Sequence, residues 1–167
     1  MNEKWLSKKL RSSFQMIKLR TFEACGLPDV PDLLATAGRG LDFWIELKCV
    51  KSAQTLIPFR KGQPKWIEDY IHDGGIVKVL VMDQTAHLLY LLELTSPIDI
   101  RTLAKSKLRD AFNSFGVAVI RQSLSDWAQT TERALLVSLS RNFPTQSPQG
   151  DYIKAILAQS SRKSHTL

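Results

Sequence analysis

Two charged residues interrupt an otherwise apolar, β-prone stretch of the sequence. The stretch is Phe43–Val50, and its charges are Glu46 and Lys48. Residues two apart in a strand project to the same face, so a carboxylate and an ammonium group would emerge together from a core strand. Burying charge is costly unless the charge is paired or bound to a metal. This placement therefore calls for a reason, either chemical or structural.

Two aspartates, Asp29 and Asp32, lie in a turn rich in Gly and Pro upstream of this stretch. With Glu46, either aspartate would form a cluster of hard oxygen ligands suited to Mg²⁺ or Mn²⁺. Such an ion polarises a phosphoryl group and lowers the pKa of bound water. Lys48 would then orient the attacking water or balance charge in the transition state. The pattern predicts metal-assisted hydrolysis of a phosphodiester.

The elements that must position these residues follow from apolar periodicity and from breakers. Apolar spacing predicts an amphipathic helix at the N-terminus, and Gly38-Arg39-Gly40 predicts a hairpin turn just before the charged strand. Pro64 is tolerated in the first turn of a helix, and Gly74-Gly75 ends that helix. The predicted order is αβββαββ, with helices over 2–14 and 65–72 and strands over 15–24, from Leu33, and over 43–50, 76–82 and 87–94.

The pattern turns mostly helical after Pro97. We expect one α/β domain with a mixed central sheet flanked by helices, in which a core over 1–97 carries a C-terminal helical extension over 98–159. A polar, proline-containing stretch predicts a linker before the last helix. The expected segments are helices over 100–112 and 125–139, a short strand over 116–120, the linker 142–150, a helix from Tyr152, and a disordered basic and polar tail over 160–167.

Positive charge exceeds negative charge in this chain of 167 residues. Lys and Arg number 23 against 16 Asp and Glu, which gives a formal net charge of +7. This balance favours a polyanionic partner, although charge alone does not choose between DNA, RNA and lipid headgroups. No apolar run is long enough to span a bilayer, so we expect no membrane partner and a cytoplasmic location. Cys25 and Cys49 lack the spacing of a zinc site or a disulfide framework.

Three segments, in this order, resemble the motifs of the PD-(D/E)XK nucleases, in particular the VRR-NUC group and phage enzymes like Holliday junction resolvases. They are the turn Gly26-Leu27-Pro28-Asp29, the strand Glu46-Leu47-Lys48 and the helix start Gln63-Pro64-Lys65-Trp66. The resemblance covers residues 1–94. It implies a restriction-endonuclease-like αβββαβ core and an Mg²⁺- or Mn²⁺-dependent, structure-selective DNA endonuclease of a bacterial or phage-infected cell.

The resemblance also implies roles for individual residues. Asp29 and Glu46 would ligate the metal, and Lys48 would serve the catalytic step. Gln63 would contact the site or the DNA backbone. Glu3 matches an acid in the first helix that many relatives use as an extra ligand.

The choice between the two aspartates stays open. Asp29 fits the Gly-x-Pro-Asp turn and is preferred, but Asp32 precedes Glu46 by an interval nearer to the usual one. The basic residues that follow the site suit phosphate contacts with duplex or branched DNA, without reading its sequence. They are Lys51, Arg60, Lys61 and Lys65. Pairing into a homodimer is compatible with the resemblance.

Each feature also has a structural interpretation. Glu46 and Lys48 could form a cross-strand ion pair on a solvated sheet face. The aspartates could be ordinary turn residues, and Gln63 could merely start its helix. The competing functions are a non-catalytic DNA-binding or phage assembly and packaging protein that keeps the nuclease fold, and a structural protein whose positive charge meets an acidic partner.

Overall fold

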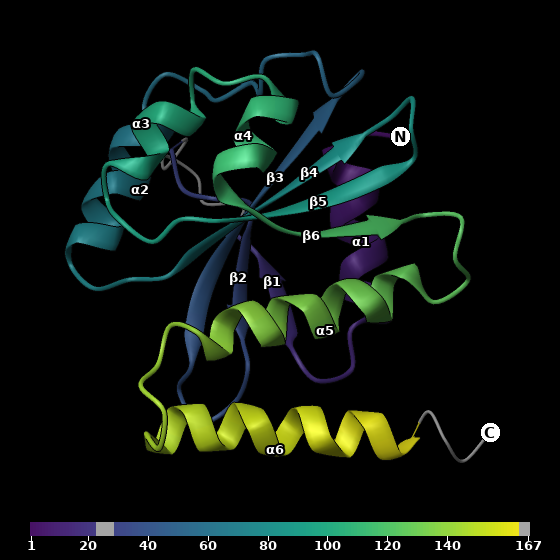
Figure 1. Ribbon diagram of the computed structural model, residues 1–167, viewed down its shortest axis with the longest axis vertical. Helices are drawn as coiled ribbons and strands as arrows, with labels where there is room; N and C mark the ends of the chain where they lie inside the picture. The colour runs from purple at the N-terminus through teal and green to yellow at the C-terminus, as the bar shows by residue number, and fades with distance from the viewer. Residues whose placement is uncertain (23–28, 164–167) are drawn as a thin grey trace.

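A mixed β-sheet runs through the molecule with helices on both faces (Figure 1). The structure, a computed structural model, describes residues 1–22 and 29–163, with side chains described through residue 161. Within these residues the strands are β1 (Lys18–Thr21), β2 (Leu33–Thr36), β3 (Asp42–Val50), β4 (Val77–Asp83), β5 (Leu88–Glu93) and β6 (Gly116–Arg121). They lie side by side in sequence order; β3 and β4 run parallel, and the other neighbours run antiparallel.

The helices of the described residues divide between the two faces of the sheet. They are α1 (Glu3–Ser13), α2 (Gln63–His72), α3 (Asp99–Leu103), α4 (Leu108–Phe115), α5 (Trp127–Ser140) and α6 (Pro148–Lys163). Helices α1, α5 and α6 contribute to one apolar core, and α2, α3 and α4 contribute to the other. The α/β class, the mixed sheet and the predicted order αβββαββ are therefore confirmed.

Strand β3 is buried along almost its whole length, because it lies inside the sheet between β2 and β4. Its alternate residues enter opposite cores: Ile45 and Leu47 face α1 and α5, whereas Trp44 and Val50 face α2 and α3. Glu46 shares the second face. A charged residue of β3 on that side must therefore find its partners inside the protein.

Helix α2 forms the crossover between the parallel strands β3 and β4. It begins at Gln63, tolerates Pro64 in its first turn, and ends at His72, followed by the C-cap residue Asp73 and by Gly74 with a φ of +93°. Its residue Ile67 is fully buried in the second core. The first residue of α2, Gln63, thereby reaches the charged part of β3.

The predicted hairpin turn joins β2 to β3. Gly38, Arg39 and Gly40 all have positive φ, at 89°, 50° and 72°. A β-carbon at Gly38 would overlap the Tyr152 hydroxyl of α6, and the Arg39 guanidinium lies 4.7 Å from the Tyr152 ring centroid. The turn therefore serves two purposes, since it reverses the chain and receives the last helix.

Two predicted elements differ from the structure because of long-range contacts. The helix expected over 100–112 is divided into α3 and α4, because the backbone between them pairs with the loop after β3. Ile57 N–H donates to the Ser106 carbonyl, and Leu108 N–H donates to the Thr55 carbonyl. The strand expected over 15–24 is limited to β1; its residues 23 and 24, like the turn residues 25–28, lie outside the described part of the chain.

The last helix is longer than its pattern predicts. Helix α6 begins at Pro148 instead of Tyr152, because proline fits the first turn of a helix, so the expected linker 142–150 is shorter. Residues 160–163 of the expected tail are helical, and residues 164–167 lie outside the described part. No helix of the described residues is long and apolar enough to cross a membrane.

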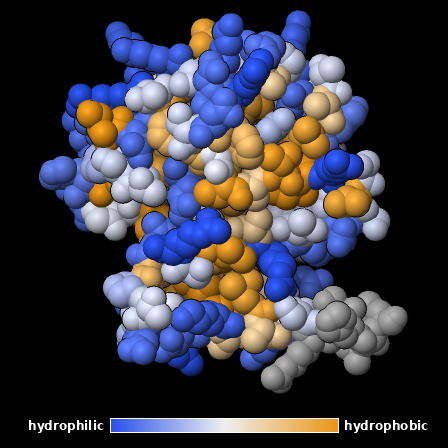
Figure 2. Space-filling model, in the orientation of Figure 1, coloured by the Kyte–Doolittle hydropathy of each residue, from blue (hydrophilic) through white to orange (hydrophobic). Residues whose placement is uncertain are grey.

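The apolar surface visible in Figure 2 gathers around β6 and α5. β6 is an edge strand, because β5 is its neighbour on one side and no described strand pairs with its other side. Its residue Val119 is 41% exposed, and Val137 of α5 is 36% exposed. The charged part of β3 belongs to a different region, deep inside the sheet.

A buried ion pair fastens the end of α5 to the sheet. Lys78 of β4 is fully buried, and its Nζ lies 3.2 Å from Glu93 Oε1 of β5 and 2.6 Å from Asn142 Oδ1. Glu93 also faces Arg141 at 3.7 Å. Burial lowers the pKa of Lys78, and the Glu93 carboxylate opposes this change. Lys78 therefore holds the connection after α5 through Asn142, and its buried ammonium group is balanced by the Glu93 carboxylate.

We predict that Glu93→Ala lowers the free energy of unfolding by about 3–5 kcal/mol, because it leaves the Lys78 ammonium buried without its counter-charge. Urea denaturation measures the loss. The double variant Lys78→Met, Glu93→Leu should recover most of it, because it removes both charges. As a control, Asp69→Ala on the exposed side of α2 should change stability little. A double variant no more stable than Glu93→Ala would contradict this account.

Candidate active site

Glu46, Lys48 and Gln63 form a closed triangle of polar contacts inside the protein. Glu46 and Gln63 are fully buried, and Lys48 is 4% exposed. Lys48 Nζ lies 2.6 Å from Glu46 Oε1 and donates to Gln63 Oε1 at 3.0 Å. Gln63 Nε2 donates to Glu46 Oε1 at 2.8 Å. The ion pair therefore lies in the interior, and the interpretation of a pair on a solvated sheet face is wrong.

The amide of Gln63 is fixed in one orientation by its partners. Its Oε1 accepts from Lys48 Nζ and also from the Arg60 backbone N–H at 2.9 Å, while its Nε2 donates to Glu46. An amide turned the other way would set donors against donors. Gln63 thus does more than start α2, because it holds the carboxylate and the ammonium group together.

One carboxylate oxygen of Glu46 has no partner among the described residues. This oxygen, Oε2, is buried, whereas Oε1 accepts from both Lys48 and Gln63. Leaving a buried acceptor without a hydrogen bond costs about 1–3 kcal/mol, and more for a charged group. The site therefore has an unused oxygen ligand at its centre, which a donor or a cation would satisfy.

The structure brings Asp32 to this group. Asp32 lies directly before β2, and its Oδ2 accepts from the backbone N–H of Leu47 at 2.9 Å, between Glu46 and Lys48 in the sequence. Burial raises the pKa of Asp32, and the Leu47 N–H and the Lys48 charge oppose this. The negative charge of Asp32 in turn acts on Glu46.

Asp29, distant from α2 in the sequence, lies beside the N-terminus of this helix in space. Its carboxylate is packed so closely against Gly62 that a β-carbon at this position would overlap it. Gly62 is the N-cap residue of α2 and directly precedes Gln63. The contacts described for the two aspartates therefore differ: Asp32 joins the backbone of β3, and Asp29 adjoins the helix that carries Gln63.

Glu3 of α1 lies within electrostatic reach of the same group. Burial raises the pKa of Glu3; the charge of Asp32 raises it further, and the Lys48 charge opposes both effects. Acids from three separate elements, α1, the segment before β2 and β3, thus act on one another around Lys48. Such a concentration of negative charge favours a positively charged ligand.

The pKa of Glu46 is raised to about 7 by burial and by the neighbouring negative charge of Asp32. The Lys48 ammonium group and the Gln63 amide act in the opposite direction. At neutral pH the carboxyl group is therefore close to its midpoint of ionisation. A bound cation would favour the ionised form, because an adjacent opposite charge stabilises a carboxylate.

The described residues fit a divalent cation through oxygen donors. No group of three or more His, Cys, Asp or Glu side chains in the described ranges is arranged to hold a metal ion. Mg²⁺, however, keeps several waters and is commonly bound by one or two carboxylates together with substrate phosphates. The free Oε2 of Glu46 and the carboxylate of Asp32 are donors of this kind.

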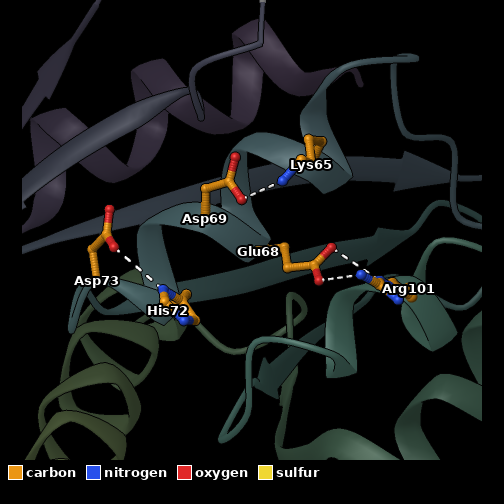
Figure 3. A network of polar contacts seen from close by, with 6 residues as sticks. All are labelled: Lys65, Glu68, Asp69, His72, Asp73 and Arg101. Carbon is orange, nitrogen blue, oxygen red and sulfur yellow. Dashed lines mark hydrogen bonds and ion pairs between the residues drawn. The ribbon is translucent and has the colours of Figure 1, made fainter.

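The basic residues singled out by sequence differ in their partners. Lys51, Arg60, Lys61 and Lys65 are all exposed. Figure 3 shows Lys65 on the outer side of α2, where its Nζ lies 2.5 Å from Asp69 Oδ1. The other three form no ion pair with any residue that the structure describes. They are therefore the better candidates for phosphate contacts.

Two contacts of the site had no signal in the sequence. The ring of Phe59 lies under Lys48, with the ammonium nitrogen 5.1 Å from its centroid. The backbone N–H of Arg60 holds Gln63. Both come from the loop between β3 and α2, whose path depends on its pairing with the segment after α3. A residue pattern could not have revealed either contact.

Comparison with known proteins adds a distant similarity. No protein-family model matches the sequence, and no curated protein matches it. Among solved structures, the chain is similar to Hjc, a Holliday junction resolvase from the archaeal hyperthermophile Archaeoglobus fulgidus. The two are 16% identical with a TM-score of 0.42, over 72% of this chain and 86% of that chain.

The raised pKa of Glu46 predicts a pH-dependent stability. Between the ordinary pKa of 4.5 and about 7, the folded state binds more protons than the unfolded state. The free energy of unfolding should therefore fall as pH rises through this window, by roughly 2–3 kcal/mol. Urea denaturation without divalent ions, at pH values from about 5 to 8, measures this slope.

The matched variants isolate the contribution of this carboxyl group. Glu46→Gln cannot ionise and should lack this component of the slope. Asp73→Asn removes an exposed carboxylate and should keep the wild-type slope. Equal slopes in wild type and Glu46→Gln would show that Glu46 titrates normally.

Proposed function

We propose that the chain is a metal-dependent endonuclease that hydrolyses DNA phosphodiester bonds at the Glu46–Lys48–Gln63 group. One observation carries the proposal: a buried carboxylate, paired on one oxygen with an ammonium group, keeps its other oxygen free. A purely structural ion pair gains by satisfying both oxygens, because an unpaired buried acceptor is destabilising. The free oxygen is accounted for if it holds a ligand during function.

In this proposal Glu46 and Asp32 would hold an Mg²⁺ or Mn²⁺ ion, and Glu3 would add negative charge beside them. The bound ion would polarise the phosphoryl group and make its water more acidic. Water is the nucleophile, so no covalent intermediate forms with the protein. Asp32 is our choice over Asp29, since Asp32 acts electrostatically on Glu46 and binds the backbone of β3.

Lys48 would stabilise the negative charge that develops on the phosphoryl oxygens, or orient the attacking water. Its position supports this role, because Glu46, Gln63 and Phe59 surround it and reduce its freedom. A preorganised charge needs little rearrangement during the reaction. Gln63 acts as a positioning residue, since its contacts are with the two charged side chains.

Charge outside the site supports a nucleic-acid substrate. The chain carries a formal net charge of +7. Lys51 and Lys61 are exposed, lie on either end of the loop between β3 and α2, and have no described ion-pair partner. Lysines of this kind neutralise phosphates and position a strand without reading its bases. Such contacts support cleavage with little dependence on the DNA sequence.

The decisive measurement is cleavage of plasmid, branched and single-stranded DNA with Mg²⁺ or Mn²⁺. Wild type should cut at least one substrate, and removal of the metal by a chelator should stop cleavage. Glu46→Gln and Lys48→Met should each lower kcat by at least about 100-fold, because each removes a charge that acts in the transition state. Lys154→Met on α6 is the control and should cut normally.

Binding without cleavage would overturn the enzymatic proposal. If wild type binds DNA but cuts none of these substrates with either metal, the chain is the non-catalytic DNA-binding or assembly protein that retains this fold. Affinity should fall steeply as salt rises if phosphates are neutralised. Negligible affinity at moderate salt would instead indicate an acidic protein partner.

The two aspartates can be separated by a matched pair of variants. Asp32→Asn keeps an oxygen for the Leu47 N–H but loses the charge, and should lower the cleavage rate by at least about 100-fold. Asp29→Asn should lower it by only about 10-fold, at the low end of the loss expected for a residue that acts beside the ligands. Titration with Mg²⁺ should show that Asp32→Asn needs a higher Mg²⁺ concentration for half-maximal cleavage than Asp29→Asn does. The reverse order would assign the ligand role to Asp29.

A further inference from the structure

The register of the sheet places two cations of β1 on the same face as the site. Lys18 of β1 pairs with Thr36 of β2, which pairs in turn with Asp42 of β3. In the same way, Arg20 pairs with Leu34, which pairs with Trp44. Cross-strand partners share a face, as do residues two apart along a strand. Arg20 therefore lies on the face that carries Trp44 and, one step further along β3, Glu46.

This face is open over β1, although it is closed over the centre of the sheet. Val77, Val79 and Val81 of β4 are buried beneath the second core, to which α2, α3 and α4 contribute. Lys18 and Arg20 are exposed, and neither forms an ion pair with a residue in the described ranges. Their positive charge is thus available to a ligand lying along β1.

A row of aromatic side chains begins at Phe22, close to these cations in the sequence, and includes Trp44, two residues before Glu46 on β3. Phe22, two residues after Arg20, is 52% exposed, and its ring meets Trp44 edge to face at 5.7 Å between centroids. Trp44 meets Trp66 at 5.7 Å, and Trp66 stacks on Tyr70 at 5.0 Å. Phe22 is thus braced from within the protein while about half of it faces solvent.

We propose that Lys18, Arg20 and Phe22 bind an unpaired nucleic-acid strand beside the Glu46–Lys48 site. Grooves that bind single strands combine cations that follow the backbone with aromatic rings on which bases stack. In a duplex the base faces already stack on one another, so a ring such as Phe22 gains a partner where bases are unstacked. The substrate class is then DNA with a single-stranded segment next to the scissile bond. This inference rests on the proposed nuclease function for its cleavage step, but not for its binding step.

Binding is measured first, with the full chain in the absence of divalent ions. Fluorescence anisotropy compares a labelled oligothymidylate with a blunt duplex of equal length. Phe22→Leu keeps an apolar side chain but loses the ring, and should weaken binding of the single strand about fivefold or more, with duplex binding unchanged. Phe22→Trp should keep wild-type affinity. Ile98→Ala, at a residue 58% exposed elsewhere, is the control.

The cations are tested by salt dependence. The double variant Lys18→Ala, Arg20→Ala should reduce the slope of log affinity against log salt by about 0.7 per lost phosphate contact on a single strand. The control double variant Arg121→Ala, Lys154→Ala removes one exposed Arg and one exposed Lys elsewhere and should leave the slope unchanged. Equal effects of the two double variants would overturn the proposal, as would a Phe22→Leu protein that binds the single strand normally.

Cleavage with Mg²⁺ separates this inference from the proposed function. A duplex with a single-stranded tail should be cut faster than a blunt duplex, and Phe22→Leu should remove the difference. Equal cutting of both substrates would overturn the inference and leave the nuclease intact. Phe22-dependent binding without any cleavage would support the inference and overturn the proposed nuclease function.

Discussion

The structure depends on keeping opposite charges together inside a sheet. Glu46 and Lys48 occupy neighbouring positions on one face of β3, where both side chains are buried and an unmatched charge would be strongly destabilising. Their contact and the amide of Gln63 satisfy four polar atoms of the three side chains, and Glu46 Oε2 is left without a partner among the described residues. The crossover helix α2 has to begin where it does because Gln63 must reach both charges. The loop after β3 has to bring Phe59 and the Arg60 N–H to the same place.

Local signals in the sequence were sufficient where a single element decides the outcome. The charged apolar stretch predicted β3, the Gly-rich turn before it predicted the hairpin, and Pro64 with Gly74-Gly75 placed α2. Contacts between distant segments decided the rest. The break between α3 and α4 results from pairing with residues 55–57. The surroundings of the two aspartates differ because Asp32 contacts the backbone of β3, whereas Asp29 contacts Gly62 at the start of α2. No periodicity encodes such contacts.

The buried acids of the site destabilise the folded protein, whereas the buried apolar residues of the sheet stabilise it. Burial raises the pKa of Asp32, Glu46 and Glu3, so their ionised forms are all disfavoured where they lie. The apolar residues around them, such as Ile45, Leu47 and Val79, are fully buried and supply the compensation. Sites of chemistry commonly violate local rules that the surrounding structure can tolerate. Here Glu46 lies on a strand that is buried along almost its whole length, between the two apolar cores.

The order of strands in the sheet repeats their order in the chain. Each strand therefore pairs with a neighbour that was synthesised immediately before it, and the nascent sheet can grow by one strand at a time as the chain leaves the ribosome. The residues of the triangle, at positions 46, 48 and 63, all emerge within the first two fifths of the chain. The helices α5 and α6, which contribute to the core on the other face of the sheet, follow all six strands in the chain.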